Sequence, residues 1–189
     1  HFIIFKKTTM NIIKLHSEIS NEEKQLINKT IKNLDFSLCD FISKKFSIDI
    51  TDDIDIIAGF ERDWSNMPGH AEYLVRPIDK NQCAIILYVC NELKIPVTIS
   101  AGKTNLTGSA TPMGGIILSI SQMNSITSMD ISKKKVTTLP GVYLEDLRNY
   151  VINKSKQQLI FPVDPTSRKD TFWLSNCLKT IRVNPRFKS

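Results

Sequence analysis

Glycine, cysteine and long hydrophobic runs are scarce in this 189-residue chain, and each scarcity excludes a class of protein. Seven glycines and eight prolines are too few for a collagen-like or low-complexity chain, and 41% apolar residues are too many for a disordered one. No apolar run approaches the roughly 20 residues that a transmembrane helix needs. We therefore expect a globular chain without a membrane span, long enough to bury a core of its own.

The four cysteines and three histidines show no metal-binding spacing, because there is no CxxC pair and no zinc-type Cys/His group. Cys83 and Cys90 are expected in the core, on one face of a helix. Isolated cysteines of this kind are typical of a reducing compartment. We expect the cytoplasm, with peripheral membrane association or organellar import as alternatives, since the first 17 residues carry no acidic side chain.

The charge balance, 25 Lys and Arg against 19 Asp and Glu, could indicate an anionic partner. The basic residues are scattered, however, apart from Lys133, Lys134 and Lys135, which we expect in a solvated turn. We therefore expect no nucleic-acid partner. The acidic residues between 52 and 63 lack EF-hand spacing and are expected to form a solvated loop, so no metal site is predicted.

Apolar spacing and turn residues predict a mixed α and β chain. Helices are expected over residues 21–33, behind a capping box of Ser20 and Glu23, and over 36–46, followed by a long connection. From residue 71, EYLVRP, a helix capped by Asp79 and the buried run IPVTIS predict a parallel strand–helix–strand unit. The next runs, IILSIS, ITSMDIS and VTTLPG, are expected to pair antiparallel, and a last helix carries Leu144, Leu147 and Val151.

The loop after IPVTIS is rich in Gly, Thr and Ser, and such a loop can present backbone N–H groups to a phosphate. Gly102, Lys103 and Thr104 match the end of a Walker A motif, but Val97 stands where its first glycine should be, and no helix is expected to follow. A nucleoside triphosphatase is therefore disfavoured. The better interpretation is that the loop from Ala101 to Asn105 wraps a pyrophosphate.

Five segments in order, between residues 63 and 167, resemble the FAD-binding domain of the FAD-linked oxidases, of the p-cresol methylhydroxylase and vanillyl-alcohol oxidase type. They are DWSNMPGHAEYLVRP, IPVTISAGKTNLTG, GGIILSISQMN, LPGVYLEDLR and FPVDPTS. Two of them are most similar to the D-lactate dehydrogenase and glycolate oxidase flavoprotein branch. The resemblance implies an α+β fold: a small parallel-strand and helix subdomain, then part of an antiparallel-sheet subdomain. The expected divisions are a helical N-terminal segment and connection (1–70), a partial FAD-binding domain (71–174) and a divergent or truncated tail (175–189).

The resemblance also implies a role for each matching residue. Ser100 to Asn105 would hold the FAD pyrophosphate, Thr107 and Gly108 would complete the turn, Gly141 would lie close to the flavin, and Asp164 to Ser167 would close on it. The expected cofactor-binding residues are Ser100, Ala101, Gly102, Lys103, Thr104, Asn105, Thr107, Gly108, Gly141, Asp164, Pro165, Thr166 and Ser167. The flavin would accept a hydride equivalent from the hydroxyl-bearing carbon of a D-2-hydroxy acid. His70, Trp64 and Trp173 are expected to be structural.

Two departures from the family pattern bear on this interpretation. Ala101 and Lys103 stand where the family loop is richer in glycine, and their Cβ atoms are expected to weaken FAD binding. After DPTS, Ser175 and Asn176 replace a Gly-Gly pair, and an Asn-Ala-x-Gly segment has no counterpart. We expect a truncated or frame-shifted ending, no nameable catalytic residue, and a hydroxy acid substrate only in a full-length protein. The alternative is a non-catalytic remnant with weak or no FAD binding.

Overall fold

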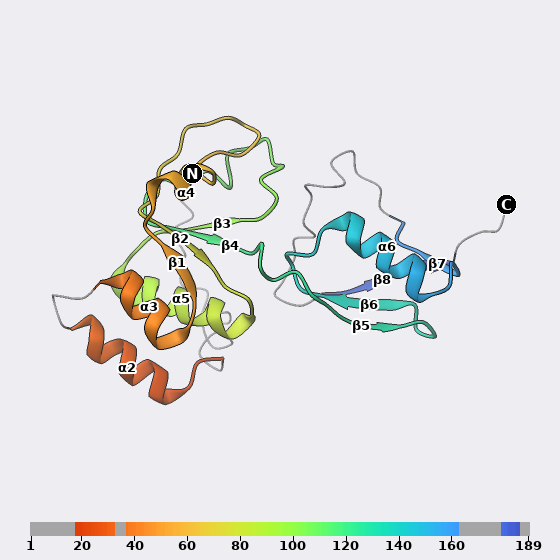
Figure 1. The fold of residues 1–189 in the computed structure, drawn as a ribbon, viewed down its shortest axis with the longest axis horizontal. Helices are drawn as coiled ribbons and strands as arrows, with labels where there is room; N and C mark the ends of the chain where they lie inside the picture. The colour runs from red at the N-terminus through yellow and green to blue at the C-terminus, as the bar shows by residue number, and fades with distance from the viewer. Residues whose placement is uncertain (1–17, 33–36, 163–178, 186–189) are drawn as a thin grey trace.

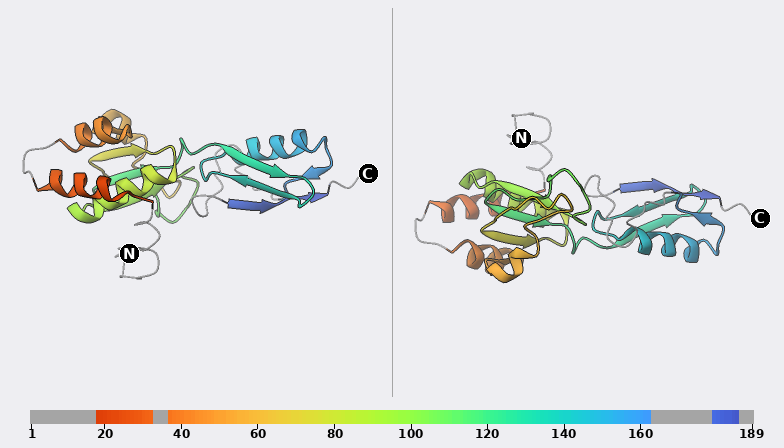
Figure 2. Two further views of the ribbon diagram at one scale, coloured as in Figure 1. Left: turned by 90° about the horizontal axis from the view of Figure 1, so that it is seen from below. Right: turned by 90° about the horizontal axis from the view of Figure 1, so that it is seen from above.

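The computed structural model describes residues 18–32, 37–162 and 179–185, which form two lobes side by side (Figures 1 and 2). The first lobe contains a four-stranded sheet with helices on both faces. The second contains a three-stranded sheet and one long helix, α6. This order, from a helical start through a parallel-strand unit to an antiparallel unit, agrees with the expected α+β class.

The N-terminal helices form where capping and apolar spacing predict them. Helix α2 (Asn21–Ile31) begins at a capping box: the Ser20 hydroxyl accepts from the Glu23 amide at 3.1 Å, and the Glu23 carboxylate accepts from the Ser20 amide at 2.7 Å. Helix α3 (Leu38–Phe46) follows. Both helices contribute to the same core cluster, through Ile27 of α2 and Ile42 of α3.

The first sheet has the strand order β1-β2-β4-β3. Strand β1 (Asp49–Thr51) is antiparallel to β2 (Tyr73–Arg76), and β4 (Ile116–Ser119) is parallel both to β2 and to β3 (Val97–Ser100). The expectation that IILSIS pairs antiparallel with the next two runs is therefore wrong. All four β4 residues are buried, because a central parallel strand is covered on both faces and reads as a continuous apolar run.

Two smaller expectations also fail in this lobe. The run IPVTIS was expected to be a buried strand, but β3 lies at the sheet edge and leaves Ile99 52% exposed. The stretch from residue 50 to 70 was expected to be a connection, yet it contains the end of β1 and the short helix α4 (Ile54–Ala58). Short elements of this length carry too few residues to show a period.

The sheet residues alternate between two cores. Val75, Ile116 and Leu118 belong to the larger cluster, which includes helix α5 (Lys80–Leu93). Leu74 and Ile117 lie on the other face with Ile57 of α4. Asp79 caps α5 by accepting from the Gln82 amide at 2.8 Å, as expected.

The second lobe is built around an antiparallel sheet in the order β5-β6-β8. The strands are β5 (Ile126–Asp130), β6 (Lys135–Thr138) and β8 (Lys179–Arg182), with a small pair of β7 (Leu159–Ile160) and β9 (Asn184–Pro185). Helix α6 (Leu144–Lys154) buries Leu144, Leu147 and Val151 in one cluster with Val136, which confirms the expected helix.

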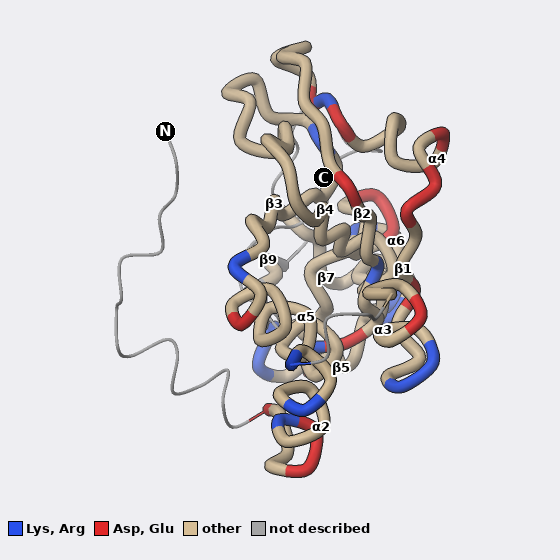
Figure 3. Tube along the Cα trace, turned by 90° about the vertical axis from the view of Figure 1, so that its left-hand side faces the viewer, with Lys and Arg blue, Asp and Glu red and all other residues tan. Residues whose placement is uncertain are grey.

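Lys and Arg residues are dispersed along the described trace among Asp and Glu residues, as Figure 3 shows. Lys133 and Lys134 lie in the exposed turn between β5 and β6, as expected, whereas Lys135, expected in the same turn, is the first residue of β6. Within the described ranges, no helix combines the length and the apolar character needed to cross a bilayer.

Strand β4 offers a test of this core assignment. Changing Ile117, which is fully buried, to Ala should lower the free energy of unfolding by about 2–5 kcal/mol through lost burial and a residual cavity. Urea unfolding followed by circular dichroism measures this change. Ile78→Ala, at a position that is 52% exposed, is the matched control and should cost far less. Equal losses in the two variants would contradict the central placement of β4.

Candidate functional site

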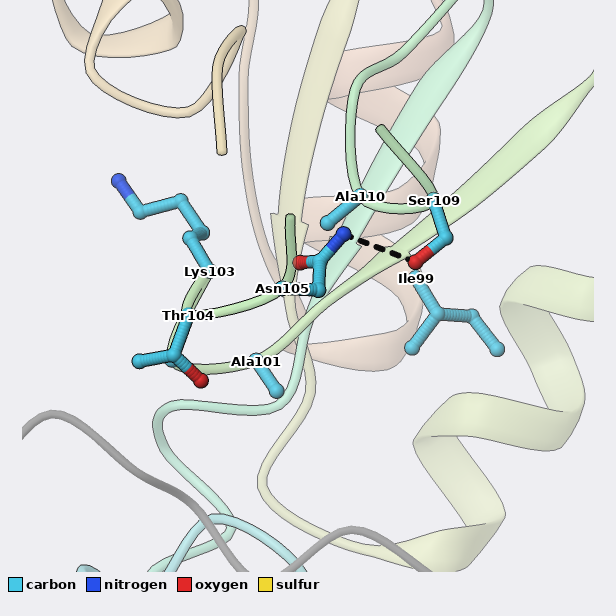
Figure 4. A pocket seen from close by; sticks show the side chains of 8 residues that line it. Ile99, Ala101, Lys103, Thr104, Asn105, Ser109 and Ala110 are labelled. Carbon is cyan, nitrogen blue, oxygen red and sulfur yellow. Dashed lines mark hydrogen bonds between the residues drawn. The ribbon is translucent and has the colours of Figure 1, made fainter. Parts of the chain in front are cut away.

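The candidate site is the loop of residues 101–115 between β3 and β4. Because these strands are parallel, the chain leaving the carboxyl end of β3 must return to the opposite end of the sheet before β4 begins. It returns without a helix, which confirms that the Walker A match is accidental. The loop and Ile99 enclose a hollow of about 140 Å³ (Figure 4). Its lining residues are Ile99, Ala101, Gly102, Lys103, Thr104, Asn105, Ser109 and Ala110.

The loop presents an unsatisfied set of hydrogen-bond donors. Within the described part of the chain, no backbone amide from Gly102 to Ser109 donates a hydrogen bond. The Ser100 hydroxyl at the end of β3 is fully buried and has no partner among those residues either. Buried polar groups without partners are rare in folded proteins. A run of free amides beside such a hydroxyl fits a bound anion such as a diphosphate.

The hollow fits part of a ligand and not a whole cofactor. Complete small-molecule sites enclose ~300–1,000 Å³, and this hollow has about 140 Å³. Its donors are mostly main-chain amides, which suit phosphate oxygens and carry no charge of their own. The loop therefore has the size and the chemistry for a pyrophosphate group.

Asp63 ties this loop to the preceding segment. One carboxylate oxygen accepts from the Ser65 amide at 2.9 Å and from the Ser65 hydroxyl. The other accepts from the Asn105 side-chain amide and from the Ala110 amide at 3.3 Å. Asn105 also donates to the Ser109 hydroxyl at 2.9 Å, as Figure 4 shows. Asp63 was expected in a solvated loop, and that expectation is wrong, since the residue is only 6% exposed.

The pKa of the Asp63 carboxyl lies below its ordinary value of 3.8. Burial alone would raise this pKa, but the hydrogen bonds donated by Ser65, Ala110 and Asn105 favour the charged form and outweigh it. Asp63 is therefore a carboxylate at neutral pH. A carboxylate can only accept hydrogen bonds, which is what four donors converging on it require.

Lys103 provides a second tie and points away from the hollow (Figure 4). Its ammonium donates to the Gly59 carbonyl and lies 4.8 Å from the centre of the Phe60 ring. Its carbonyl accepts from the Trp64 amide at 3.1 Å. The backbone of Lys103 has φ +54°, the left-handed region that favours glycine. Trp64 is 60% exposed, so the expectation that it packs in the interior is wrong.

The structure brings most of the expected loop residues together. Ala101 to Asn105 line the hollow, Ser100 is buried just before them without lining it, and Gly108 turns the chain at φ +72°. Gly141 is buried against the segment after β4, where its amide donates to the Met123 carbonyl at 2.8 Å. A Cβ at Gly141 would collide with the backbone of Ile120, so the chain itself accounts for this glycine. Thr107 is exposed.

Some of the remaining expected residues lie outside the described part of the chain, and the others are placed by the structure. Asp164, Pro165, Thr166 and Ser167 lie outside the described residues, as does Trp173. His70 is exposed, and its backbone bridges to Met113, which fits its expected structural role. Cys83 and Cys90 are buried in α5, as expected. The described residues contain no group of three or more His, Cys, Asp or Glu side chains that could hold a metal ion.

Sequence reasoning missed Asp63 as part of the site. The signal was present in Asp63-Trp64-Ser65, because an Asp two residues before a Ser can accept from both its amide and its hydroxyl. The acidic residues nearby concealed it, since they made a solvated loop the simplest interpretation. The partner residues Asn105 and Ala110 lie more than 40 positions away, and only the fold brings them to Asp63.

Solved structures define the class of fold. The structure is similar to that of p-cresol methylhydroxylase with substrate bound, with a TM-score of 0.58 and 18% sequence identity, over 77% of this chain and 27% of that one. At this identity the likeness concerns the fold alone. It confirms the expected class, the FAD-binding fold of p-cresol methylhydroxylase.

A family model described as an FAD binding domain matches residues 71–172, and the chain belongs to this family. FAD is accordingly its cofactor. The chain is 38% identical over 95 residues to D-lactate dehydrogenase of Anaerostipes hadrus, covering 50% of this chain and 19% of that protein. It is 31% identical over 107 residues to glycolate oxidase subunit GlcD of Bacillus subtilis, covering 56% and 22%. The chain thus spans about a fifth of the length of these two relatives.

The ionisation of Asp63 predicts a pH-dependent stability difference. A pKa that is lower in the folded chain stabilises the fold above the unfolded value, and this contribution is lost as pH falls through the folded value, below 3.8. The melting temperature of Asp63→Asn should therefore lie below that of the wild type at neutral pH, and this gap should narrow at acid pH. Melting curves at about pH 7 and about pH 3 measure it. For Ile117→Val, which has no titrating group, the gap should not narrow in this way.

Proposed function

We propose that the loop from Ser100 to Gly108 binds the pyrophosphate of FAD, chiefly through main-chain amides. The observation that carries this proposal is the run of amides from Gly102 to Ser109 without partners in the described chain, in a segment of which Gly102 to Asn105 and Ser109 line the hollow. A loop whose own donors were paired internally would have nothing to offer a phosphate. The Thr104 hydroxyl lines the same hollow and is a further donor.

The other expected residues retain their proposed roles. Thr107 and Gly108 complete the turn of the loop, and Gly141 lies near the flavin. Its position supports this, because the Ile120 that leaves no room for a side chain there also donates its amide to the Ser100 carbonyl at 3.0 Å. The proposed contacts to the flavin and ribityl region come from Asp164, Pro165, Thr166 and Ser167.

The chain is proposed to be the FAD-binding part of a longer dehydrogenase that oxidises a D-2-hydroxy acid such as D-lactate or glycolate. The bound flavin supplies the acceptor for a hydride equivalent from the hydroxyl-bearing carbon. The chain's own residues bind and orient the cofactor, and the substrate meets it only in the longer protein. The names of the relatives, D-lactate dehydrogenase and glycolate oxidase, support this substrate class. We assign no nucleic-acid partner.

The domain division and the compartment belong to the same proposal. Residues 71–174 carry most of the FAD-binding part, and residues 1–70 form the N-terminal segment that adds β1 and Asp63 to it. Residues 175–189 are proposed as a divergent tail, but residues 179–182 within it add β8 to the sheet of the second lobe. Cys83 and Cys90 are buried and form no disulfide in the described chain, which supports a reducing compartment, the cytoplasm, with peripheral membrane association or organellar import as the alternatives.

An FAD titration of the purified 189-residue chain tests the proposed function. Flavin fluorescence should change on binding, and the melting temperature should rise, because a ligand that binds only the folded state stabilises it by about 2.7 kcal/mol at a hundred times its Kd. Riboflavin, which lacks the pyrophosphate, is the matched control and should bind far more weakly. A folded chain indifferent to FAD would instead support the non-catalytic alternative.

Lys103 allows a separate test of the loop geometry. Lys103→Gly and Lys103→Ala both remove the ammonium contact with Gly59, but only the glycine variant removes the Cβ at φ +54°. Since the left-handed conformation costs an L-residue about 1–2 kcal/mol, the glycine variant should bind FAD about five-fold or more tightly than the alanine variant. Parallel titrations give the two Kd values. Equal affinities would show that the Cβ does not hinder the loop.

A further inference from the structure

The family match begins at residue 71, yet the contacts that hold the cofactor loop come from residues before it. Lys103 is bound to Gly59 and Trp64, and the far side of the loop is bound to Asp63. We call residues 59–65 the brace. The brace meets the loop near its start, at Lys103, and near its end, at Ala110.

We propose that Asp63 is the positioning residue of the cofactor loop, residues 100–110: its carboxylate holds Asn105 and Ala110, two residues that line the hollow, so that the loop keeps the shape that receives the phosphate. This inference rests on the proposed function of the loop. Asp63 does not touch the cofactor in this scheme. It acts through the loop, from a position eight residues before the family match begins.

The geometry at Asp63 supports a positioning role beyond simple packing. One carboxylate oxygen accepts hydrogen bonds from the amide and the hydroxyl of Ser65, which fixes the carboxylate within the brace. Its second oxygen receives two donors from the loop, the Asn105 side chain and the Ala110 amide. Both of these residues line the hollow. The carboxylate therefore joins a fixed turn to the wall of the candidate site.

A fixed loop matters here because its amides make no hydrogen bonds to the described chain that would hold them in place. Ordering a free loop on binding costs affinity, and a loop held in its bound shape avoids that cost. Hydrogen bonds to a charged acceptor are stronger than neutral ones, which suits Asp63 to the task.

The test compares Asp63→Asn with two matched controls in the full 189-residue chain. Asp63→Asn removes the negative charge and replaces one accepting oxygen by an NH₂ group, which can only donate. This NH₂ group faces N–H or O–H donors that the carboxylate oxygen accepted from, so the contact with the loop is weakened. Asp130→Asn changes a similar exposed turn of the second lobe, where Asp130 accepts from the Ser132 hydroxyl at 2.7 Å and the Lys133 amide at 2.9 Å. Ile117→Val lowers stability in the core of the sheet without touching the loop.

Two readouts are needed. The first is the rate of trypsin cleavage after Lys103, relative to cleavage after Lys156 in the exposed turn that follows α6, without any ligand. The second is the Kd for FAD, measured at a temperature where every variant is folded. Asp63→Asn should raise the relative cleavage rate and weaken FAD binding, each by about ten-fold or more, the equivalent of one lost charge-assisted hydrogen bond. Neither control should change either quantity by as much.

The outcomes separate the two proposals. If the wild-type chain does not bind FAD, the proposed function fails, and the cleavage rate alone decides whether Asp63 fixes the loop. If Asp63→Asn binds FAD like the wild type, or if Ile117→Val weakens binding as much, the positioning role is overturned. If Asp63→Asn does not fold, Asn105→Ala replaces it, because it removes only the Asn105 contact, and should weaken FAD binding about three-fold or more. No weakening in Asn105→Ala would likewise overturn the role.

Discussion

The parallel pairing of β3 with β4 is the constraint on which the rest of the site depends. A parallel pair needs a connection that travels the length of the sheet, and most proteins fill it with a helix, whose amides are bonded internally. Here the connection is residues 101–115, without a helix, and the amides from Gly102 to Ser109 donate to nothing in the described chain. The same topology that buries β4 therefore creates the donor-rich hollow at the end of β3.

An irregular loop of this kind needs support from elsewhere, and the chain supplies it from a segment earlier in the sequence. Asp63 and Lys103 both connect the brace to the loop. Asp63 belongs to the brace and contacts the loop, whereas Lys103 belongs to the loop and contacts the brace. Neither charge lies free in the hollow. The recognition chemistry left to the loop is the neutral polarity of main-chain N–H groups and hydroxyls, which favours an extended phosphate ligand over a small cation.

Local features of this fold could be predicted from the sequence, and long-range pairings could not. Ser20 with Glu23 and Asp79 with Gln82 mark helix starts because the partners are three residues apart. Strand β4 was recognised as a strand but assigned to the wrong sheet, because an apolar run shows that both faces are covered and not which neighbours cover it. The place of Asp63 in the site was not predicted for the same reason, because its partners in the loop are more than 40 positions away. The loop itself was found through its motif, since residue types at fixed spacing define it.

Strand β1 determines which strand lies at one edge of the first sheet. It consists of three residues, and it covers the side of β2 that would otherwise present unpaired N–H and C=O groups. Arg76 and Asp49 fasten the two strands with an ion pair at 2.8 Å. A chain that started at residue 71, where the family match starts, would lack β1. The N–H and C=O groups of β2 that pair with β1 would then be exposed, beside Leu74 and Val75. With β1 in place, the edge on this side of the sheet is a strand of only three residues.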